Sequence, residues 1–457
     1  MLSIFNTGAS AAAIPIWFVT ATTYKDVRER LSAAARAFAD AAGFEPKPGQ
    51  YLALPGEGGL SGILFGLENG DDAKDLFLPG RLPQQLPSGV YRFANDPHDV
   101  RLAALGFALG TYRFTRYHKS EARKIKLDLP QSLARDDLER VVEAVTLVRD
   151  LVNTPANDMG PADLEEAART LAARHGAGVR ATVGDDLLSE NFPLIHAVGR
   201  AAARRPRLID LTWGEADHPR VTLVGKGVCF DSGGLDIKPE SSMLNMKKDM
   251  GGAATALALA HMIMSRGLPV RLRVLIPAVE NSISGSAFRP RDIYTSRKGI
   301  TVEIGNTDAE GRLILADALA LADEDKPELI FDFATLTGAA RVALGPDVPP
   351  FFTEDDDLAD KLMAHATAEN DPLWRLPLWR PYDDMLESKV ADINNVGSGG
   401  QAGAITAALF MRRFVTAKSW AHFDVFAWSP RSRPGRPEGG ECQAARALYA
   451  LLAARYG

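Results

Sequence analysis

The chain has 457 residues, of which 46% are hydrophobic and 24% are charged, and its formal net charge at pH 7 is −6. This length allows two domains, or one large domain with an appendage, and the acidic balance disfavours a general affinity for nucleic acid. The two cysteines, Cys229 and Cys442, provide no disulfide framework and indicate a reducing compartment, so we expect a cytoplasmic location.

The N-terminal part of the chain predicts a small α/β domain, which we place at residues 1–134. The apolar run 11–19 is too short to span a bilayer and follows no basic segment, so it indicates a buried strand rather than a signal peptide. Residues 24–42 have the period of an amphipathic helix. A strand is predicted at residues 62–66, within a segment rich in glycine and proline.

A helix is predicted over residues 136–152, where apolar side chains recur with a helical period. We therefore place a linking helix at residues 135–155 and a larger domain at residues 156–457. In this larger domain strand-like runs alternate with helical segments, which favours a central mixed sheet flanked by helices. The predicted strands cover residues 207–213, 220–225, 270–277, 328–333 and 420–427, and the predicted helices cover residues 163–175, 251–266, 312–322 and 402–416.

Four charged residues stand out because their neighbours are apolar or glycine: Lys226, Asp231, Lys238 and Asp249. Burying these charges is costly unless they form ion pairs or bind a metal ion. A lysine can ligate a metal only as the neutral amine, and its ordinary pKa of about 10.4 makes this rare unless a nearby dication and burial lower it. The alternative for each lysine is a buried ion pair with an aspartate. We favour that alternative for any single lysine, but not for the whole set.

Residues 306–313 carry a second charged pattern, in which Asp308, Glu310 and Arg312 alternate with other residues. In an extended segment these three side chains point to the same side, and Gly311 lets the backbone approach closely. Two carboxylates and a guanidinium suit a divalent metal and an anion, although a charged surface loop explains this pattern alone equally well. Because both charged segments follow strand-like runs, we expect them at the carboxyl ends of strands in an open α/β sheet.

Together these segments resemble the leucyl aminopeptidase family, also called cytosol aminopeptidases, which are dinuclear metallopeptidases of the M17 type. The octapeptide that marks the family is present unchanged at residues 306–313, and the seven charged residues keep the order and spacing of the family. The resemblance covers residues 150–430. It implies that residues 156–457 form a catalytic metallopeptidase domain.

The resemblance implies a set of metal ligands in this chain. Asp231 and Glu310 would bridge two divalent ions, Lys226 and Asp249 would complete one site, and Asp308 would complete the other. Manganese and zinc are the first candidates for the two ions in each subunit, and magnesium and cobalt are further candidates.

The resemblance also implies a reaction, the removal of the N-terminal residue from short peptides. A hydroxide shared by the two metals would attack the scissile carbonyl, and the free amine of the peptide would coordinate the metal held by Lys226. Lys238 would stabilise the oxyanion, and Arg312 would hold a bicarbonate ion that shuttles the proton. The resemblance further implies a homohexamer.

The pocket for the first side chain of the substrate departs from the family pattern. By resemblance Met246, Thr335 and Gly338 would line it, and ordinary packing is the alternative for these three residues. The family usually has a small alanine-glycine pair where residues 425–428 read Val-Phe-Ala-Trp, so Phe426 or Trp428 is expected to narrow or reshape the pocket, and the preference for leucine stays open.

Two other functions remain as alternatives, namely binding of nucleic acid or a regulatory partner, and a different dinuclear hydrolase such as a phosphoesterase. The acidic balance argues against the first, and lysine among the ligands without histidine argues against the second. Asp332 and Asp424 lie in apolar strand-like runs, where they either support the site from behind or make local hydrogen bonds. His422 is read as a core or near-site residue without a role.

Overall fold

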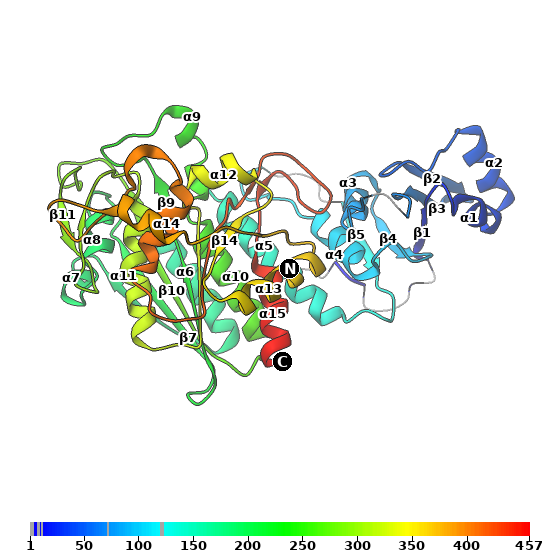
Figure 1. Cartoon of the computed structure of the whole chain (residues 1–457). Helices are drawn as coiled ribbons and strands as arrows, with labels where there is room; N and C mark the ends of the chain where they lie inside the picture. Colours follow the sequence, from blue (N-terminus) through cyan, green and yellow to red (C-terminus); the bar gives the residue numbers. More distant parts are fainter. Residues whose placement is uncertain (1–3, 7–9, 11, 71–72, 119–122) are drawn as a thin grey trace. The chain divides into compact units, whose positions relative to one another are not determined.

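The computed structural model describes residues 4–6, 10, 12–70, 73–118 and 123–457 (Figure 1). The chain divides into two compact units. The N-terminal unit comprises Met1–Thr146 and Arg431–Glu438, and the C-terminal unit comprises Leu147–Pro430 and Gly439–Gly457. The division falls inside the long helix α5 (Arg135–Asn153), in the region where the sequence predicts a linking helix.

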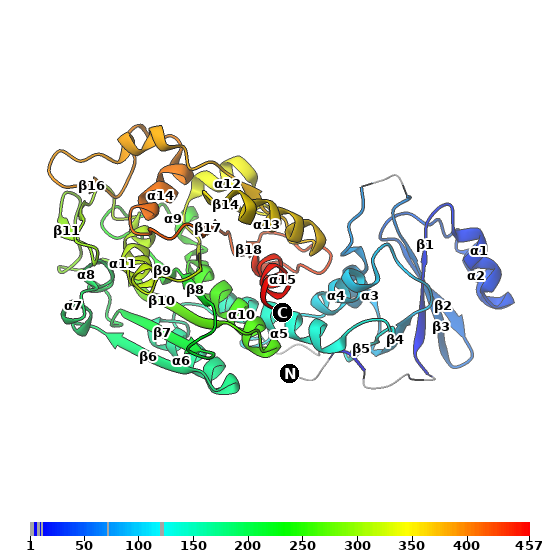
Figure 2. The same cartoon turned by 60° about the horizontal axis from the view of Figure 1, so that its bottom comes forward.

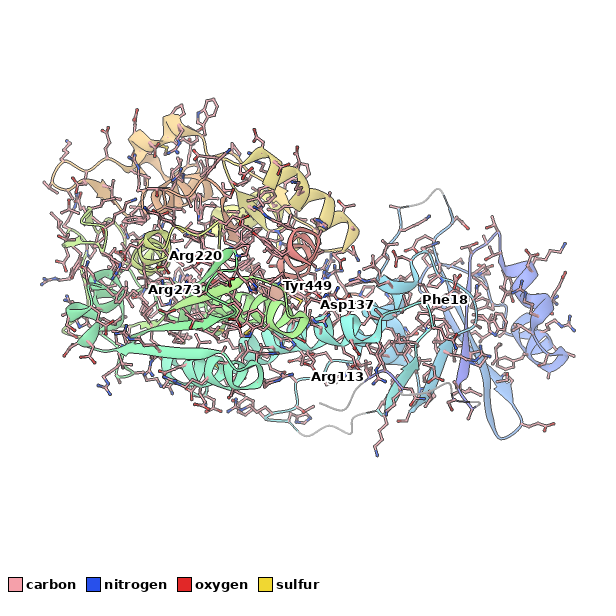
Figure 3. The ribbon with its side chains drawn as sticks, turned by 90° about the horizontal axis from the view of Figure 1, so that it is seen from below. Phe18, Arg113, Asp137, Arg220, Arg273 and Tyr449 are labelled. Atoms are coloured by element: carbon pink, nitrogen blue, oxygen red, sulfur yellow. The ribbon has the colours of Figure 1, made fainter. Side chains whose placement is uncertain are left out.

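The N-terminal unit is built on a mixed sheet in the order β2-β3-β1-β4-β5. Strand β1 pairs in parallel with β3 and β4, and β2 runs antiparallel to β3. Phe18 on β1 contacts Phe65 and Phe93 edge to face, which fills the core beside the sheet (Figure 3). The strands are β1 (Ile14–Val19), β2 (Tyr51–Gly56), β3 (Gly59–Gly66), β4 (Gly89–Phe93) and β5 (Ile125–Asp128), and the helices are α1 (Tyr24–Arg30), α2 (Ala33–Ala41), η1 (Leu78–Arg81), α3 (Leu82–Gln85) and α4 (Val100–Gly110).

The prediction of one helix over residues 24–42 is wrong, because the structure has two. Leu31 and Ser32 adopt extended backbone angles between α1 and α2. The Ser32 side chain accepts a hydrogen bond from the backbone N–H of Ala35 and so caps the second helix. The predicted strand 11–19 begins only at Ile14, and residue 11 lies outside the described residues.

The C-terminal unit contains a larger mixed sheet, in the order β15-β14-β17-β13-β8-β10-β7-β6 with β9 paired to β10. Strands β10, β8, β13 and β17 run parallel in its centre, and antiparallel pairings extend the sheet on both sides. The strands are β6 (Gly178–Val183), β7 (Arg207–Trp213), β8 (Arg220–Gly225), β9 (Gly227–Asp231), β10 (Arg271–Asn281), β13 (Leu329–Ala334), β14 (Pro350–Phe352), β15 (Trp374–Arg375) and β17 (Trp420–Asp424).

Helices cover both faces of this sheet (Figure 2). Helix α10 packs with α6 and α15, whereas α11 packs with α8 and α14 and shares their apolar core. The helices are α6 (Pro161–His175), α7 (Asp186–Ser189), α8 (Pro193–Gly199), α9 (Glu240–Met243), η2 (Met246–Lys248), α10 (Gly251–Arg266), α11 (Glu310–Glu324), α12 (Gly338–Leu344), α13 (Asp356–Ala368), η3 (Arg380–Leu386), η4 (Ser398–Gly400), α14 (Gly403–Arg412) and α15 (Ala445–Tyr456). The expected α/β architecture with a central mixed sheet is confirmed.

Short strands outside the main sheet form two further pairings. One small sheet has the order β11-β12-β16, and β18 pairs with β19. These strands are β11 (Ile293–Thr295), β12 (Thr301–Glu303), β16 (Ile393–Asn394), β18 (Trp428–Ser429) and β19 (Gly439–Gly440). None of the helices in the described residues combines the length and the apolar composition that a membrane-spanning helix needs.

The first turn of α10 lies directly against the strands that carry the charged residues. The backbone N–H of Ala253 donates a hydrogen bond to the carbonyl of Lys226. The backbone N–H of Lys226 donates to the carbonyl of Phe333. Gly252 permits this approach, because a Cβ atom there would lie 2.1 Å from the carbonyl oxygen of Phe333. The helix can therefore hold the segment before it against the ends of β8 and β13.

We predict that Gly252→Ala lowers the free energy of unfolding by about 1–3 kcal/mol, because the new methyl group forces α10 away from β13. Thermal unfolding of the purified variants measures this change. Gly285→Ala is the matched control, since a Cβ at that exposed glycine would meet no atom within 4 Å. Equal midpoints for the two variants would contradict the close contact.

Candidate metal centre

Two of the predicted ligands stand where strands of the main sheet end, and a third lies between two helices. Lys226 lies between β8 and β9, and Asp231 is the last residue of β9. Asp249 follows η2 and precedes α10, whose contact with the Lys226 backbone was described above. All three side chains are buried, with exposed fractions of 2–3%.

The remaining two predicted ligands, Asp308 and Glu310, lie just before and at the start of a helix rather than in an extended segment. Asp308 lies in the loop before α11, Glu310 is the first residue of that helix, and Arg312 lies in its first turn. The predicted extended geometry is therefore wrong, and the positive end of the helix dipole is a favourable place for the Glu310 carboxylate. The expected position after a strand of the main sheet is also wrong, because the preceding strand, β12, belongs to the small sheet.

Gly311 lets α11 approach Lys226. A Cβ atom at this glycine would lie 2.6 Å from Cε of Lys226, closer than real side chains come. The lysine stem thus occupies the space that any other residue at position 311 would need. The glycine is required here for close approach rather than for its backbone angles.

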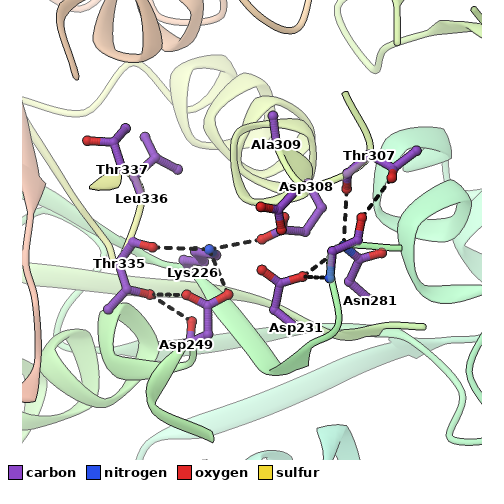
Figure 4. Close-up of polar contacts among 12 residues, drawn as sticks. Lys226, Asp231, Asp249, Asn281, Thr307, Asp308, Ala309, Thr335, Leu336 and Thr337 are labelled. Atoms are coloured by element: carbon purple, nitrogen blue, oxygen red, sulfur yellow. Dashed lines mark hydrogen bonds and ion pairs between the residues drawn. The ribbon is translucent and has the colours of Figure 1, made fainter. Parts of the chain in front are cut away.

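The carboxylates converge on one point. Asp231, Asp308 and Glu310 each offer an oxygen atom, and these atoms all lie within 4.8 Å of one another. Figure 4 shows Lys226 between Thr335 and Asp308, with Asp249 and Asp231 beside it. The predicted ligands from four separate segments are therefore brought together.

Both lysines form ion pairs inside this cluster. Lys226 Nζ lies 2.8 Å from Oδ2 of Asp249 and 2.9 Å from Oε1 of Glu310. Lys238 Nζ lies 2.8 Å from Oδ2 of Asp231 and 2.5 Å from Oδ1 of Asp308. Each lysine thus forms the buried ion pair with an aspartate that the sequence offers as the alternative to metal binding.

The two lysines do not neutralise the cluster, because four carboxylates meet there. Burial, followed by the charge of Asp231, raises the pKa of Glu310 to about 8, and the same two causes raise the pKa of Asp308 to about 6. Burial alone would lower the pKa of Lys226, but Asp249 and Glu310 raise it above its usual range. One buried oxygen, Oε2 of Glu310, accepts no hydrogen bond within the described residues. This surplus of buried negative charge and the free oxygen fit divalent metal ions.

Neutral side chains orient the carboxylates. Asn281, at the end of β10, donates from Nδ2 to Oδ1 of Asp231 at 2.9 Å and to the carbonyl of Thr307 at 3.1 Å. The hydroxyl of Thr335 donates to Oδ1 of Asp249 at 2.6 Å. Asn281 is not among the residues predicted for the site, and the signal for it is an amide at the end of a strand whose central residues are apolar.

Arg312 is buried beside the cluster. One of its amino nitrogens donates to the carbonyl of Asn395 at 2.7 Å, whereas its Nε donates no hydrogen bond within the described residues. Burial lowers the pKa of this guanidinium to about 10, against the opposing effect of Glu310. The side chain therefore remains a cation with donor capacity that no protein group uses.

Two of the three predicted pocket residues belong to the Asp249 side of the cluster. Thr335 makes the hydrogen bond to Asp249, and Met246 begins η2 three residues before that aspartate. Gly338 begins α12, and a Cβ atom there would meet no atom within 4 Å. Thr335 is therefore in contact with Asp249, Met246 is near it in the sequence, and the space beside Gly338 is open.

Asp424 fixes the loop between β13 and α12. It accepts hydrogen bonds from the backbone N–H of Leu336 at 3.0 Å and from the hydroxyl of Thr337 at 2.6 Å, and it pairs with Arg341 at 2.8 Å. Burial raises the pKa of this carboxyl and Arg341 lowers it, with a net shift downward, so Asp424 is ionised. It thereby holds the loop that carries Thr335.

Asp332 serves a different, fully buried network between β13 and β17. It accepts a hydrogen bond from the indole of Trp420 at 2.7 Å, and its other oxygen lies 2.6 Å from Nδ1 of His422. All three side chains are essentially inaccessible. The local hydrogen bonding expected as one alternative for Asp332 is what the structure has.

Comparison with protein families matches nearly the whole chain. The model of the cytosol aminopeptidase family, catalytic domain, matches residues 146–449, and the model of the M17 aminopeptidase N-terminal domain matches residues 14–130. Among curated proteins, a probable cytosol aminopeptidase of Syntrophotalea carbinolica is 42% identical over 371 residues, which cover 77% of this chain and 74% of that protein.

Solved structures agree with the family match. The cytosol aminopeptidase from Coxiella burnetii is 46% identical and superposes with a TM-score of 0.95, covering 99% of this chain and all of that one. The bottromycin maturation enzyme BotP in complex with Mn is 33% identical, with a TM-score of 0.88 over 98% of this chain and all of that one. Both likenesses extend over the two units described above.

We predict that Mn²⁺ raises the unfolding temperature of chelator-treated protein, because ion binding stabilises the folded state by about 2.7 kcal/mol at a concentration of 100 times Kd. Asp308→Ala should lose most of this shift, since it removes one of the converging oxygen ligands. Differential scanning calorimetry with and without Mn²⁺ measures the effect. Asp360→Ala, an exposed carboxylate on α13, is the control. An unchanged shift in the Asp308 variant would place the ion elsewhere.

Proposed function

Because the chain belongs to the cytosol aminopeptidase family of metalloexopeptidases, we propose that it removes the N-terminal residue from short peptides with the help of two divalent metal ions. The observation that carries this proposal is the convergence of the Asp231, Asp308 and Glu310 oxygens within 4.8 Å. A buried carboxylate cluster of this size has no structural benefit without cations, because the charges repel one another.

The residues proposed to hold the ions come from the resemblance to the family, and the contacts of the cluster support them. We assign Asp231 and Glu310 to both ions, Lys226 and Asp249 to one, and Asp308 to the other. Lys226 is an ammonium in its ion pairs with Asp249 and Glu310, and it would have to lose a proton to bind a metal ion. When bound, divalent ions polarise a carbonyl group and lower the pKa of a water molecule, which is the chemistry that peptide hydrolysis needs.

Lys238 is assigned to the stabilisation of the oxyanion. Burial alone would lower its pKa, but Asp231 and Glu310 raise it above the usual range, so the side chain is an ammonium and cannot act as a base. Its Nζ lies next to two of the proposed ligands, and its side chain is 12% exposed. A fixed positive charge at this place favours the negative oxygen that forms when the carbonyl is attacked.

Arg312 is assigned to a bicarbonate ion that carries the proton. The support for this assignment is a buried guanidinium whose Nε donates no hydrogen bond within the described residues. Its planar fork can bind a small planar anion through two parallel hydrogen bonds. No histidine is among the predicted ligands, so a bound anion would supply the base that the chain itself does not.

Further proposals concern the whole protein. We propose manganese or zinc as the ions, and the Mn complex of the relative BotP supports manganese. We also propose an N-terminal α/β domain at residues 1–134, a linking helix at 135–155 and a catalytic domain at 156–457. A homohexamer is proposed from the family. A cytoplasmic location is proposed because Cys229 and Cys442 are free and buried, as in a reducing compartment.

We predict that chelator-stripped protein hydrolyses aminoacyl-p-nitroanilides only after Mn²⁺ or Zn²⁺ is restored, and that N-acetylated substrates stay intact because they lack the free amine. Release of p-nitroaniline measures both effects. Equal turnover of free and acetylated substrates would refute an exopeptidase. Activity that survives the chelator in protein shown to contain no metal would refute the metal dependence.

We predict that Lys238→Met lowers kcat by about 10²–10³-fold with a smaller change in KM, because the lost charge acts mainly on the transition state. Steady-state kinetics of the metal-loaded protein measure both constants. Lys361→Met, which removes an exposed lysine on α13, is the control and keeps the activity. A loss confined to KM would reassign Lys238 to substrate binding.

A further inference from the structure

Lys248 is a buried cation next to the proposed metal centre. It is the last residue of η2 and directly precedes Asp249, and only 5% of it is exposed. Within the described residues its Nζ takes part in no hydrogen bond and no ion pair. A buried ammonium without a counter-ion is costly, so its position calls for an explanation beyond packing.

The nearby carboxylates are already committed to other partners. Oδ2 of Asp249 lies 2.8 Å from Nζ of Lys226, and its Oδ1 accepts the hydroxyl of Thr335. Asp424 holds Arg341 and the loop after β13. Both carboxylates attract Lys248 through their charge, but neither forms an ion pair or a hydrogen bond with it.

The group in contact with Lys248 is an aromatic ring that a second cation shares. Nζ of Lys248 lies 4.7 Å from the centroid of the Phe426 ring, and Cζ of Arg341 lies 5.3 Å from the same centroid. The face of an aromatic ring attracts a cation, but it does not cancel a full charge. The three side chains thus form a patch with an aromatic centre, in which Arg341 is paired with Asp424 and Lys248 has no ion pair within the described residues.

This patch adjoins the residues that are predicted to line the pocket for the first side chain of a peptide. Arg341 is on α12, which begins at Gly338, and Thr335 contacts Asp249. In Figure 4, Thr335 and Leu336 lie on the Asp249 side of Lys226, away from Asn281. If Lys226 and Asp249 hold the ion that receives the amine, the side chain that branches from the next carbon atom would meet Lys248.

We propose that the pocket selects an acidic first residue, glutamate or aspartate, and that Lys248 is the residue that recognises its carboxylate. This inference rests on the proposed aminopeptidase function and specifies its substrate class. A carboxylate would supply the missing counter-ion of Lys248, whereas a neutral amide would leave the charge uncompensated. A basic side chain would place a second unpaired cation beside Lys248 and is disfavoured by repulsion.

The test compares substrates that differ in charge but not in shape. Metal-loaded full-length protein is given the p-nitroanilides of Glu and Gln, of Asp and Asn, and of Lys, and kcat/KM is measured for each. We expect Glu to exceed Gln on the order of tenfold or more, as a charge-assisted hydrogen bond implies, and Lys to be the poorest substrate. Equal values for Glu and Gln would overturn the proposal.

Variants of Lys248 separate its charge from its size. Lys248→Met keeps the length without the charge and should bring the Glu/Gln ratio close to one, whereas Lys248→Arg should keep a ratio in favour of Glu. Lys361→Met, the exposed lysine on α13, should leave the ratio as in the wild type. A Glu/Gln ratio that survives Lys248→Met would overturn the role of this lysine. Metal content and unfolding temperature show that each variant is folded and loaded.

Calorimetric binding provides a readout that does not depend on turnover. Titration of metal-loaded protein with free glutamate and free glutamine, which are reaction products, should show tighter binding of glutamate that weakens in Lys248→Met. If the wild type hydrolyses no substrate, the proposed function is wrong and this comparison alone decides the role of Lys248. If substrates are hydrolysed but both measurements show no preference for the acid, only the inference about the pocket fails.

Discussion

The C-terminal unit is organised around buried negative charge. Four carboxylates, from Asp231, Asp249, Asp308 and Glu310, meet at the ends of strands and at the start of a helix, and two lysines offset only part of their charge. Such a cluster destabilises the fold unless each oxygen is hydrogen-bonded, ion-paired or bound to metal. The hydrogen bonds from Asn281 and Thr335 and the ion pairs of both lysines meet this condition in part. The negative charge that remains favours the binding of cations at this place.

Close packing at two glycines leaves the charged side chains little freedom to move. Helices α10 and α11 come so close to β13 and to Lys226 that Gly252 and Gly311 have no room for a side chain. The helices are in turn held by apolar packing against the sheet, which is rigid because it is dense. The position of the charged groups is thus set by the hydrophobic core rather than by the loops alone. The same arrangement leaves Lys248 buried beside Phe426.

The sequence predicts those features that depend on local pattern. The continuous apolar runs of β8, β10 and β13 are visible without a structure, and so is the helical period of α10. The break at Ser32 was missed because apolar positions continue through it, and only the cap marks the end of one helix and the start of the next. The alternation of charge in the octapeptide predicts an extended segment up to residue 312, where a helix is predicted to begin, whereas α11 already begins at Glu310.

Features that depend on contacts between residues far apart in the chain could not be predicted from the sequence. Asn281 has a role only because β10 ends beside β9, and Lys248 stands out only once its neighbours are known to be paired with other groups. The charged residues proposed for the site are predicted from their type and spacing, which a motif preserves. Their ion pairs and hydrogen bonds emerge only from the topology of the sheet.

The order of the strands also bears on how the protein is made. Strand β17 comes late in the chain yet lies beside β13, and its Asp424 fixes the loop that carries Thr335. During synthesis the sheet can gain β8, β10 and β13 first, while the wall of the site that includes this loop has no anchor until β17 leaves the ribosome. Because long-range pairing of this kind forms late and slowly, the growing chain carries its ligands without a finished active site. A nascent protease of this design is therefore inert until nearly all of it has been translated.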